Sequence, residues 1–444
     1  MPSRHPRALG APTALVALFT AGYLAPYLLP TVVGRLSAGL GLGPAQAGLV
    51  GSILLLGSAC AGFTLAARVD RVGPRRAARL GLLAMVLGYG TAAATDSVAP
   101  VVLGAVVGGF GSGTSTAVAA AGIAGRPDPQ RTSTLGLLSV SAAAGALYLT
   151  LPHLGGGHAL PFAAIAAAAV LVWPVTAWLP AAGRSVRDAP SVAGPAPHRG
   201  SGAVLAGAVL LWSMAQNALW GVSGRIGLTQ AGLSEVALGM VFAAALGAGL
   251  VGVTAAGALG SRLGRAVPVG AGTALIAGCV LLSSAARGPA SFAAGEILWN
   301  ALYPVVLSYL LGLAASLDPR GRWAVLVGSA SSLGVACGPV TGSLLSEAAG
   351  YPGMGVALCA LLLLTALPMT AVAHHTSGRP LVPGSVRRRG GAPTAVLAGT
   401  ASATPPQVPQ MGAPEQQVAE IAVAARPARA TRSAFRLARP DGRD

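Results

Sequence analysis

Residues 66–76 read AARVDRVGPRR, a charged loop set between two long apolar runs. The loop recurs in weaker form between Gly257 and Arg265, where Ser261-Arg262-Leu263-Gly264 follows Asp70-Arg71-Val72-Gly73 by 191 positions. Two more pairs recur 190 positions apart, Gly34-Arg35 with Gly224-Arg225 and Asp128-Pro129 with Asp318-Pro319. Separated landmarks that keep one offset indicate a duplicated unit. We therefore expect two similar halves.

The composition places both halves in a membrane. Hydrophobic residues make up 53% of the 444 positions and charged residues only 9%, which leaves too little polar surface for a soluble domain. A helix that crosses the hydrocarbon needs about 20 apolar residues, and the chain offers six such runs in each half. We predict an all-α membrane protein with twelve transmembrane helices in two pseudo-symmetric six-helix bundles, at approximately 12–35, 45–67, 76–95, 99–124, 132–152, 159–180, 202–225, 234–258, 266–286, 290–315, 322–345 and 353–373.

Arginine placement predicts the orientation. With the N-terminus in the cytoplasm, 26 of the 29 arginines fall on the cytoplasmic side, and the other three are Arg35, Arg225 and Arg287. Membrane proteins keep positive charge on the cytoplasmic side. We therefore expect a multi-pass protein of the plasma or inner membrane with both termini inside. We therefore expect the net charge of +17 to lie beside anionic lipid and not to bind nucleic acid.

Three segments lie outside the predicted bundles. Residues 1–11 form a cytoplasmic N-terminus, and the first bundle covers 12–180. Residues 181–201 form a cytoplasmic linker to the second bundle, 202–373. Residues 374–444 are rich in Pro, Ala, Arg and Gln and lack a periodic apolar pattern, so we predict a disordered cytoplasmic tail.

The sequence gives no sign of a metal or cofactor site. The four cysteines all fall within predicted spans and show no CxxC spacing. The six histidines form no group of three or four donors of the kind that a zinc site needs. HExxH, Walker and GxSxG motifs are also missing from the sequence. We expect no metal, no cofactor and no enzymatic activity.

The loop 66–76 lies between the second and third spans and resembles the signature loop of the major facilitator superfamily, commonly written GxxxDRxGRR. Ala66 and Pro74 depart from that pattern, and Ser261 replaces the acid in the second copy. The resemblance extends over approximately 12–373. It implies a secondary transporter in which two bundles enclose a site and open alternately to the two sides of the membrane. The matching positions are Asp70, Arg71, Gly73, Arg75 and Arg76, with Gly257 and Gly264 in the second copy.

The charged loop also suggests a mechanical role. An ionised Asp70 at a helix end can pair with an arginine or accept from the first amides of the next helix. Such a contact can hold one conformation of a two-state bundle. The alternative is that Asp70 only caps the third helix. We predict a conformational latch composed of Asp70, Arg71, Gly73, Arg75, Arg76, Arg262 and Gly264.

The tenth span reads GEILWNALYP from Gly295 and carries the one acidic residue that we place well inside a span, Glu296. Glu296, Asn300 and Tyr303 share a helical face. An ionisable group at the bilayer centre costs about 3 kcal/mol, so Glu296 suggests a water-filled cavity or a partner. We predict that it couples transport to protons. The alternative is a structural glutamate that is hydrogen-bonded to neighbouring helices.

The resemblance implies a cavity between the first, fourth, seventh and tenth helices. In this chain the first, seventh and tenth carry aromatic and amide side chains, which suit an amphipathic ligand with a flat or apolar body. Tyrosines also serve as anchors at the membrane interface, so both interpretations stay open. The predicted cavity residues are Tyr23, Tyr27, Ser213, Gln216, Asn217, Trp220, Trp299, Asn300 and Tyr303.

Two patterns of the family are displaced here. Ala105 stands where many drug:proton antiporters of the family carry an arginine, ahead of the GxGxG stretch 109–113. The glycine run of the antiporter fifth helix occurs in the eleventh span instead, as Gly334, Gly338-Pro339 and Gly342. Antiport is therefore not established by motif. Sugar and peptide transporters of the family carry more charge in their cavities, which favours a weakly charged or neutral substrate here.

We expect a secondary active transporter that exports a small amphipathic compound in exchange for protons and functions as a monomer surrounded by membrane lipid. A second hypothesis is proton-coupled uptake of an organic acid or another small metabolite, with Arg35 and Arg225 attracting the anion at the outer ends of two helices. Both arginines can instead reach to lipid headgroups. A non-transporting membrane sensor or scaffold is a hypothesis of another class.

The arginine asymmetry makes a topological prediction. Fluorescent reporters fused after residues 190 and 380 should fluoresce inside the cell, because both points lie on the arginine-rich side. Fusions of a reporter that is active only outside the cytoplasm should stay inactive at both points. Activity of the latter reporter at either point would contradict the six-plus-six layout.

Overall fold

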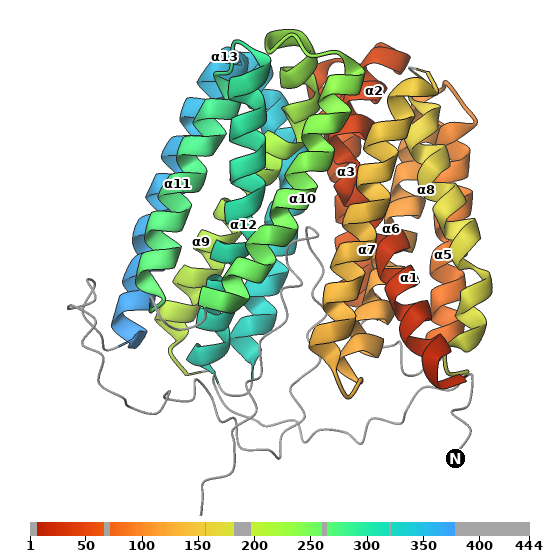
Figure 1. The fold of residues 1–444 in the computed structure, drawn as a ribbon, viewed down its shortest axis with the longest axis horizontal. Coiled ribbons are helices and arrows are strands. Elements are labelled where there is room, and N and C mark those ends of the chain that lie inside the picture. Colours follow the sequence, from red (N-terminus) through yellow and green to blue (C-terminus); the bar gives the residue numbers. More distant parts are fainter. Residues whose placement is uncertain are drawn as a thin grey trace, which may run out of the picture.

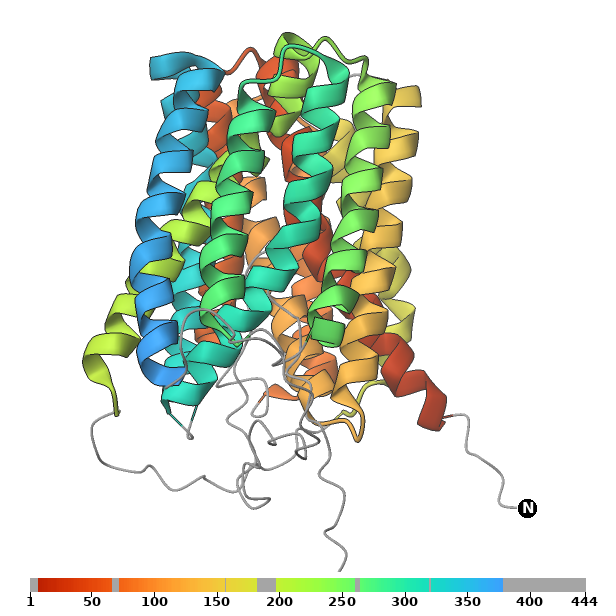
Figure 2. The same cartoon turned by 60° about the vertical axis from the view of Figure 1, so that its left-hand side comes forward.

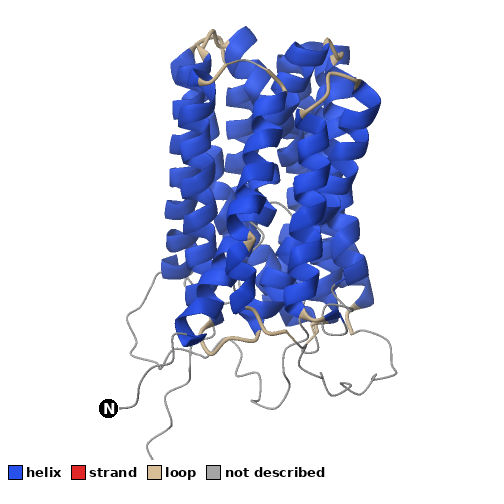
Figure 3. Ribbon diagram, turned by 90° about the vertical axis from the view of Figure 1, so that its right-hand side faces the viewer, coloured by secondary structure: helices blue, strands red, loops and turns tan. Residues whose placement is uncertain are grey.

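The computed structural model describes residues 7–65, 72–155, 157–181, 197–259, 264–318 and 321–377. Within them the regular structure is entirely helical (Figure 3). The first half of the chain contains α1 (Arg7–Tyr27), α2 (Leu29–Leu40), α3 (Pro44–Leu65), α5 (Pro74–Ala93), α6 (Val98–Ala124), α7 (Pro129–Thr150), η1 (Leu151–His153), α8 (Ala159–Val172) and η2 (Pro174–Trp178). The second half contains α9 (Arg199–Arg225), η3 (Ile226–Gln230), α10 (Glu235–Leu259), α11 (Ala266–Ser284), α12 (Pro289–Leu317) and α13 (Arg322–Ser377).

These elements confirm the predicted fold of twelve membrane helices. Nine helices of the described residues are long and apolar enough to cross a bilayer, and the bent pair α1 and α2 adds a tenth span. The long α13 is two helices, because Gly350 turns the chain with a φ of 69° in its middle. The remaining span is α5, which carries Arg75, Arg76 and Arg79 in its first turns.

The first span is not the single straight helix that the sequence predicts. It breaks at Leu28, where α1 and α2 meet at 48°. Pro30 explains the break, because proline has no N–H to donate to the carbonyl four residues earlier and its ring clashes there. That carbonyl belongs to Pro26, and it accepts a hydrogen bond from the indole of Trp220 instead, with Nε1 3.1 Å from the oxygen.

The helices form two groups that lie side by side, the first half of the chain in one and the second half in the other (Figure 1). Helix α1 begins and helix α13 ends at the same end of the molecule (Figure 2). We call this the proximal end and the opposite one the distal end. The tail predicted for 374–444 falls outside the described residues from 378 onward, and most of the linker, 182–196, also does.

Glycine permits a close helix contact in the second half. Gly334, Gly338 and Gly342 of α13 lie directly against α9, where an added Cβ would collide with backbone or side-chain atoms of Leu210, Asn217 and Ala218. Small residues of this kind let membrane helices approach until their backbones touch. The displaced glycine pattern of the eleventh span therefore has a packing role in this structure.

The duplication is also visible in the turns. Gly73, before α5, and Gly264, before α11, both adopt positive φ angles, 88° and 69°. These glycines stand 191 positions apart, in the two copies of the charged loop. Gly41 and Gly232, which precede α3 and α10, show the same offset with φ angles of 63° and 70°. The left-handed region strains other L-residues, so each loop uses glycine at the equivalent turn.

The two halves meet at the distal end. There α2 packs on α9, α3 on α13, and α7 on α10. Besides the bond between Trp220 and Pro26, the Val340 amide donates to Ser52 Oγ over 2.9 Å, and Arg35 pairs with Glu235 at 3.1 Å. The distal contact is therefore closed in this structure.

The glycine contact between α13 and α9 can be tested with two matched substitutions. Gly334→Ala should lower thermal stability by about 1–3 kcal/mol, because the new methyl collides with the Leu210 carbonyl. Gly328→Ala on the same helix is the control, since no atom lies within 4 Å of a Cβ there. Thermal unfolding of purified protein in detergent measures both. Equal melting temperatures for the two variants would contradict the packing role.

Candidate functional site

Glu296 lies two turns into α12 and is completely buried. The Ser223 hydroxyl of α9 donates to its Oε1 over 2.9 Å. The Ser283 hydroxyl of α11 lies near the carboxyl group, but neither it nor Glu296 Oε2 has a hydrogen-bond partner among the described residues. The carboxyl group thus sits between three helices of the second half with one oxygen bound and the other without a hydrogen-bond partner among the described residues.

Six aromatic rings form a continuous series beside Glu296, which we call the aromatic chain. It begins on α7 of the first half and continues through α10, α9 and α12 of the second half. Neighbouring ring centroids lie 5.0, 5.3, 5.7, 6.1 and 4.9 Å apart, within the range of favourable aromatic pairs. In order, its members are Tyr148, Phe242, Trp220, Trp299, Tyr303 and Trp212.

Amide and hydroxyl groups line the same region. The Trp299 indole donates to Gln216 Oε1 over 2.8 Å, which links α12 to α9. Asn217 and Asn300 each donate to a carbonyl of their own helix, over 3.0 and 2.9 Å. Ser213 exchanges a hydrogen bond of 2.6 Å with Ser331 of α13. Helices α9 and α12 therefore share a polar surface as well as an aromatic one.

The break in the first span adds backbone acceptors to this region. The Pro26 carbonyl accepts from Trp220, and the next carbonyl, of Tyr27, accepts from the Tyr148 hydroxyl over 2.6 Å. Tyr148 belongs to α7 and Trp220 to α9, so one donor comes from each half. Tyr23 lies one turn earlier and packs against Phe19, with ring centroids 4.6 Å apart.

The structure brings most of the predicted cavity residues together but leaves them closed off from solvent. Trp220 is the most exposed of the nine at 7%. Gln216, Trp220, Trp299 and Tyr303 form one cluster through the contacts above. This arrangement differs from an open water-filled cavity, because the aromatic rings fill the space between α9 and α12.

Three of the seven predicted latch residues lie outside the described residues, namely Asp70, Arg71 and Arg262. The described part has a local role. Arg75 donates to the carbonyls of Ala177 and Leu179, over 2.7 and 2.6 Å, at the end of η2. Basic side chains commonly bind the last free carbonyls of a helix in this way. Arg76 is exposed, and Gly73 and Gly264 form the turns described above.

Arg35 and Arg225 occupy equivalent positions in the two halves, and both are buried. Arg35 donates to the Leu151 carbonyl over 3.1 Å in addition to pairing with Glu235. Arg225 donates to Ser343 Oγ over 3.2 Å. One donor of each, Arg35 Nη1 and Arg225 Nε, has no hydrogen-bond partner among the described residues.

Sequence reasoning did not identify the partners of these groups. Ser223 and Ser283 contribute hydroxyls beside Glu296, yet a serine in an apolar span carries no signal of its own. Tyr148 and Phe242 join the aromatic chain from helices outside the expected cavity set. Glu235 is an acidic residue at the start of a predicted span. Its charge, opposite to that of Arg35, was the signal in the sequence that could have indicated this ion pair.

Two bundles of membrane helices, with a buried polar and aromatic site at the contact between them, define a secondary transporter fold. The comparisons agree with this class. The family model of the Major Facilitator Superfamily matches residues 11–319, so the chain belongs to that superfamily. A search of curated proteins finds no match.

A solved structure shares the fold. The crystal structure of the human organic anion transporter MFSD10 (TETRAN) superposes with a TM-score of 0.59. The match covers 82% of this chain and 100% of that one, at 19% sequence identity. At this identity the likeness concerns the fold alone, and it agrees with the architecture that the family model indicates.

The ion pair between Arg35 and Glu235 should help to keep the distal contact closed. Arg35→Glu or Glu235→Arg should weaken the contact by about 1 kcal/mol, because Glu235 is half exposed. The double variant with Arg35→Glu and Glu235→Arg should restore the contact. Spin labels on the loops before α3 and α10 report the distance between the halves, which should lengthen in each single variant and return in the double one.

Asp96→Arg is the matched control for this experiment. Asp96 is an exposed acid at the same end, and the imidazole of His158, 4.0 Å from its carboxylate, belongs to its own half. This change should leave the distance unaltered. If it lengthens the distance as much as Glu235→Arg does, general charge rather than the ion pair controls the contact.

Proposed function

We propose that this transporter moves a small amphipathic compound out of the cell in exchange for protons, with Glu296 as the proton-coupling residue. The observation that carries the proposal is the burial of this carboxyl group, with Oε2 lacking a hydrogen-bond partner among the described residues. Native proteins satisfy most buried polar atoms, so an unsatisfied one suggests a role beyond packing.

A buried carboxyl group suits proton coupling because its neutral and ionised forms are stable in different surroundings. The neutral form can remain in a dry site beside two hydroxyls, whereas the ionised form requires water or a positive partner. Opening the site to water would thus favour proton release, and closing it would favour the neutral form. A protein that alternates between these states can exchange one proton in each cycle.

In a cycle of alternating access, this structure corresponds to a state that is closed at the distal end. The contacts between α2 and α9, α3 and α13, and α7 and α10 close the distal end. If the arginine distribution sets the orientation as expected, the protein lies in the plasma or inner membrane with its distal end facing outward and both termini in the cytoplasm. We infer that the substrate is loaded from the cytoplasm in a related state.

The aromatic chain supports a substrate with a flat apolar body. Its six rings offer stacking surfaces, and the nearby amides of Gln216, Asn217 and Asn300 offer hydrogen bonds. The Trp212 indole N–H is buried and has no acceptor among the described residues. When the aromatic rings move apart, the Trp212 N–H can donate to a ligand and Glu296 Oε2 can accept from it.

The second candidate function is uptake of an organic acid. It is favoured by the two distal arginines, because Arg35 Nη1 and Arg225 Nε are buried donors without a partner among the described residues. A carboxylate that enters from the distal side could accept a hydrogen bond from a donor of this kind. The name of the human neighbour describes an organic anion transporter, which is compatible with this candidate. Arg225→Gln should abolish transport if this function holds and leave an amphipathic exporter active.

Glu296→Gln tests proton coupling directly. Glutamine keeps the shape and hydrogen bonding of a protonated glutamate but cannot release a proton. A host that expresses the parent should resist some members of a panel of toxic amphipathic compounds, and one of these then serves as the transported compound in liposomes. The variant should lose accumulation driven by a pH gradient, while exchange of the compound without a gradient should continue.

Asn300→Ala and Tyr303→Phe are the matched controls, since both lie on the same face of α12. They should change the affinity for the compound and retain dependence on the gradient. Transport against a gradient by Glu296→Gln at the parental rate would show that this residue is structural. A parent that moves no compound in either direction would favour the sensor or scaffold hypothesis.

A further inference from the structure

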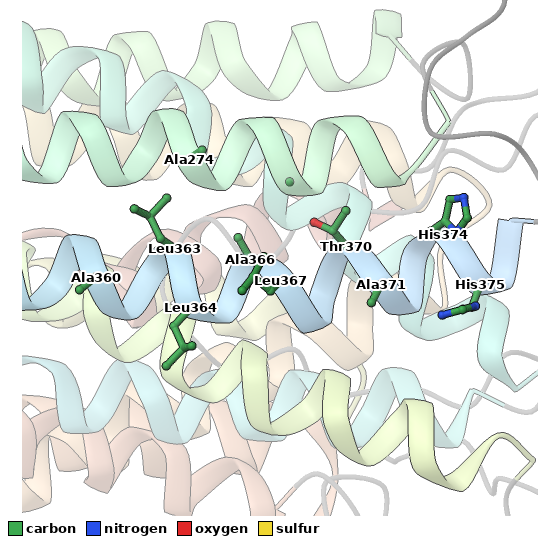
Figure 4. Close-up of a pocket in the computed structure, with 11 residues that line it drawn as sticks. Ala274, Ala360, Leu363, Leu364, Ala366, Leu367, Thr370, Ala371, His374 and His375 are labelled. Atoms are coloured by element: carbon green, nitrogen blue, oxygen red, sulfur yellow. The ribbon is translucent and has the colours of Figure 1, made fainter.

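A groove lies on the outer surface of the second half, away from the site described above. It runs between α11 and the part of α13 after Gly350 and has a volume of about 760 Å³. Figure 4 shows Leu363 and Thr370 directed from α13 toward α11, where Ala274 faces them. Volumes of about 300–1,000 Å³ are typical of pockets that hold small molecules.

The groove arises from the sizes of its residues. The helices approach each other closely at Gly270, where an added Cβ would lie 2.7 Å from the Thr370 hydroxyl oxygen. Ala274 and Ala360 fill little of the space beside that contact. The leucines that border the groove are exposed, Leu364 by 64% and Leu367 by 69%. This surface therefore faces the lipid.

The occupant of such a groove in a bilayer is hydrocarbon. Water fills a cavity only where it finds several polar partners, and along the groove the one hydroxyl is that of Thr370. An empty groove would also forfeit the dispersion contacts of its lining. A flexible acyl chain meets both conditions, because it is apolar and adapts to the shape.

The proximal end of the groove is polar. His374 and His375 lie in the last turn of α13, with ring centroids 5.9 Å apart, and both line the groove. Figure 4 shows them at one end of the row, beyond Thr370 and Ala371. Imidazole N–H groups donate to phosphate oxygens. In the sequence, four arginines follow shortly afterwards, Arg379 and 387–389.

We propose that this groove is a binding site for an anionic phospholipid, with one acyl chain between α11 and α13 and the phosphate at His374 and His375. Basic residues beside a membrane attract anionic lipids, and the small side chains of the groove provide the space for the chain. The site is distinct from the aromatic chain, and its occupancy does not depend on which compound the protein transports.

Native mass spectrometry of the full-length protein tests the proposal. The detergent-purified chain is offered equal amounts of phosphatidylglycerol and phosphatidylcholine, which share acyl chains and differ in headgroup charge. The parent should retain one phosphatidylglycerol in preference. Ala360→Phe, which fills the groove, should weaken retention of both lipids by roughly fourfold or more, as expected when at least one methylene loses its contacts.

The headgroup and the matched control are tested separately. His374→Ala with His375→Ala should reduce the preference for phosphatidylglycerol about fivefold while the groove still retains lipid. Ala167→Phe on α8 is the control, because it places the same ring on an exposed alanine of the other half. Equal lipid retention by Ala360→Phe and Ala167→Phe would overturn the proposal. A parent without headgroup preference, or one whose groove is covered by a second copy in a dimer, would overturn it as well.

Discussion

Close backbone contact at glycine is the constraint on which this bundle depends. Lipid is as apolar as a leucine side chain, so burial of apolar surface does not bring two membrane helices together as it does in water. Packing contacts must do so, and they are strongest where backbones touch. Gly334, Gly338 and Gly342 supply that contact between α13 and α9. In the first half, Gly88 of α5 lies against Gly104 and Gly108 of α6 in the same way.

The position of α9 determines the geometry of the candidate site. Helix α9 is held by the glycines of α13 on one side, and it presents Gln216 to Trp299 and Ser223 to Glu296 of α12. A shift of α9 by a fraction of an ångström would alter both hydrogen bonds. Packing and polar contacts in this region are therefore parts of one arrangement, and a substitution at the glycines would also disturb Glu296.

The sequence predicted the number of spans from composition, the duplication from pairs of residues at one offset, and the burial of Glu296 from its place within an apolar span. It did not predict the break at Leu28, although Pro30 was visible, because proline near a helix end is often tolerated. It also did not predict that Trp220 would bond to the broken first span and lie almost fully buried. Whether a cavity is open depends on how two halves meet, and that relation is not encoded in the pattern of any single helix.

The broken first span connects the closure of the distal end to the surroundings of Glu296. Pro30 leaves the Pro26 carbonyl without a helical donor, and Trp220 of the other half supplies one. Ser223, one turn later on the same helix as Trp220, donates to Glu296. Separation of the halves at this point would free the carbonyl and displace α9 relative to α1. Because Trp220 and Ser223 share one helix turn, the contact between the halves and the hydrogen bond to the buried carboxyl group depend on the same segment of α9.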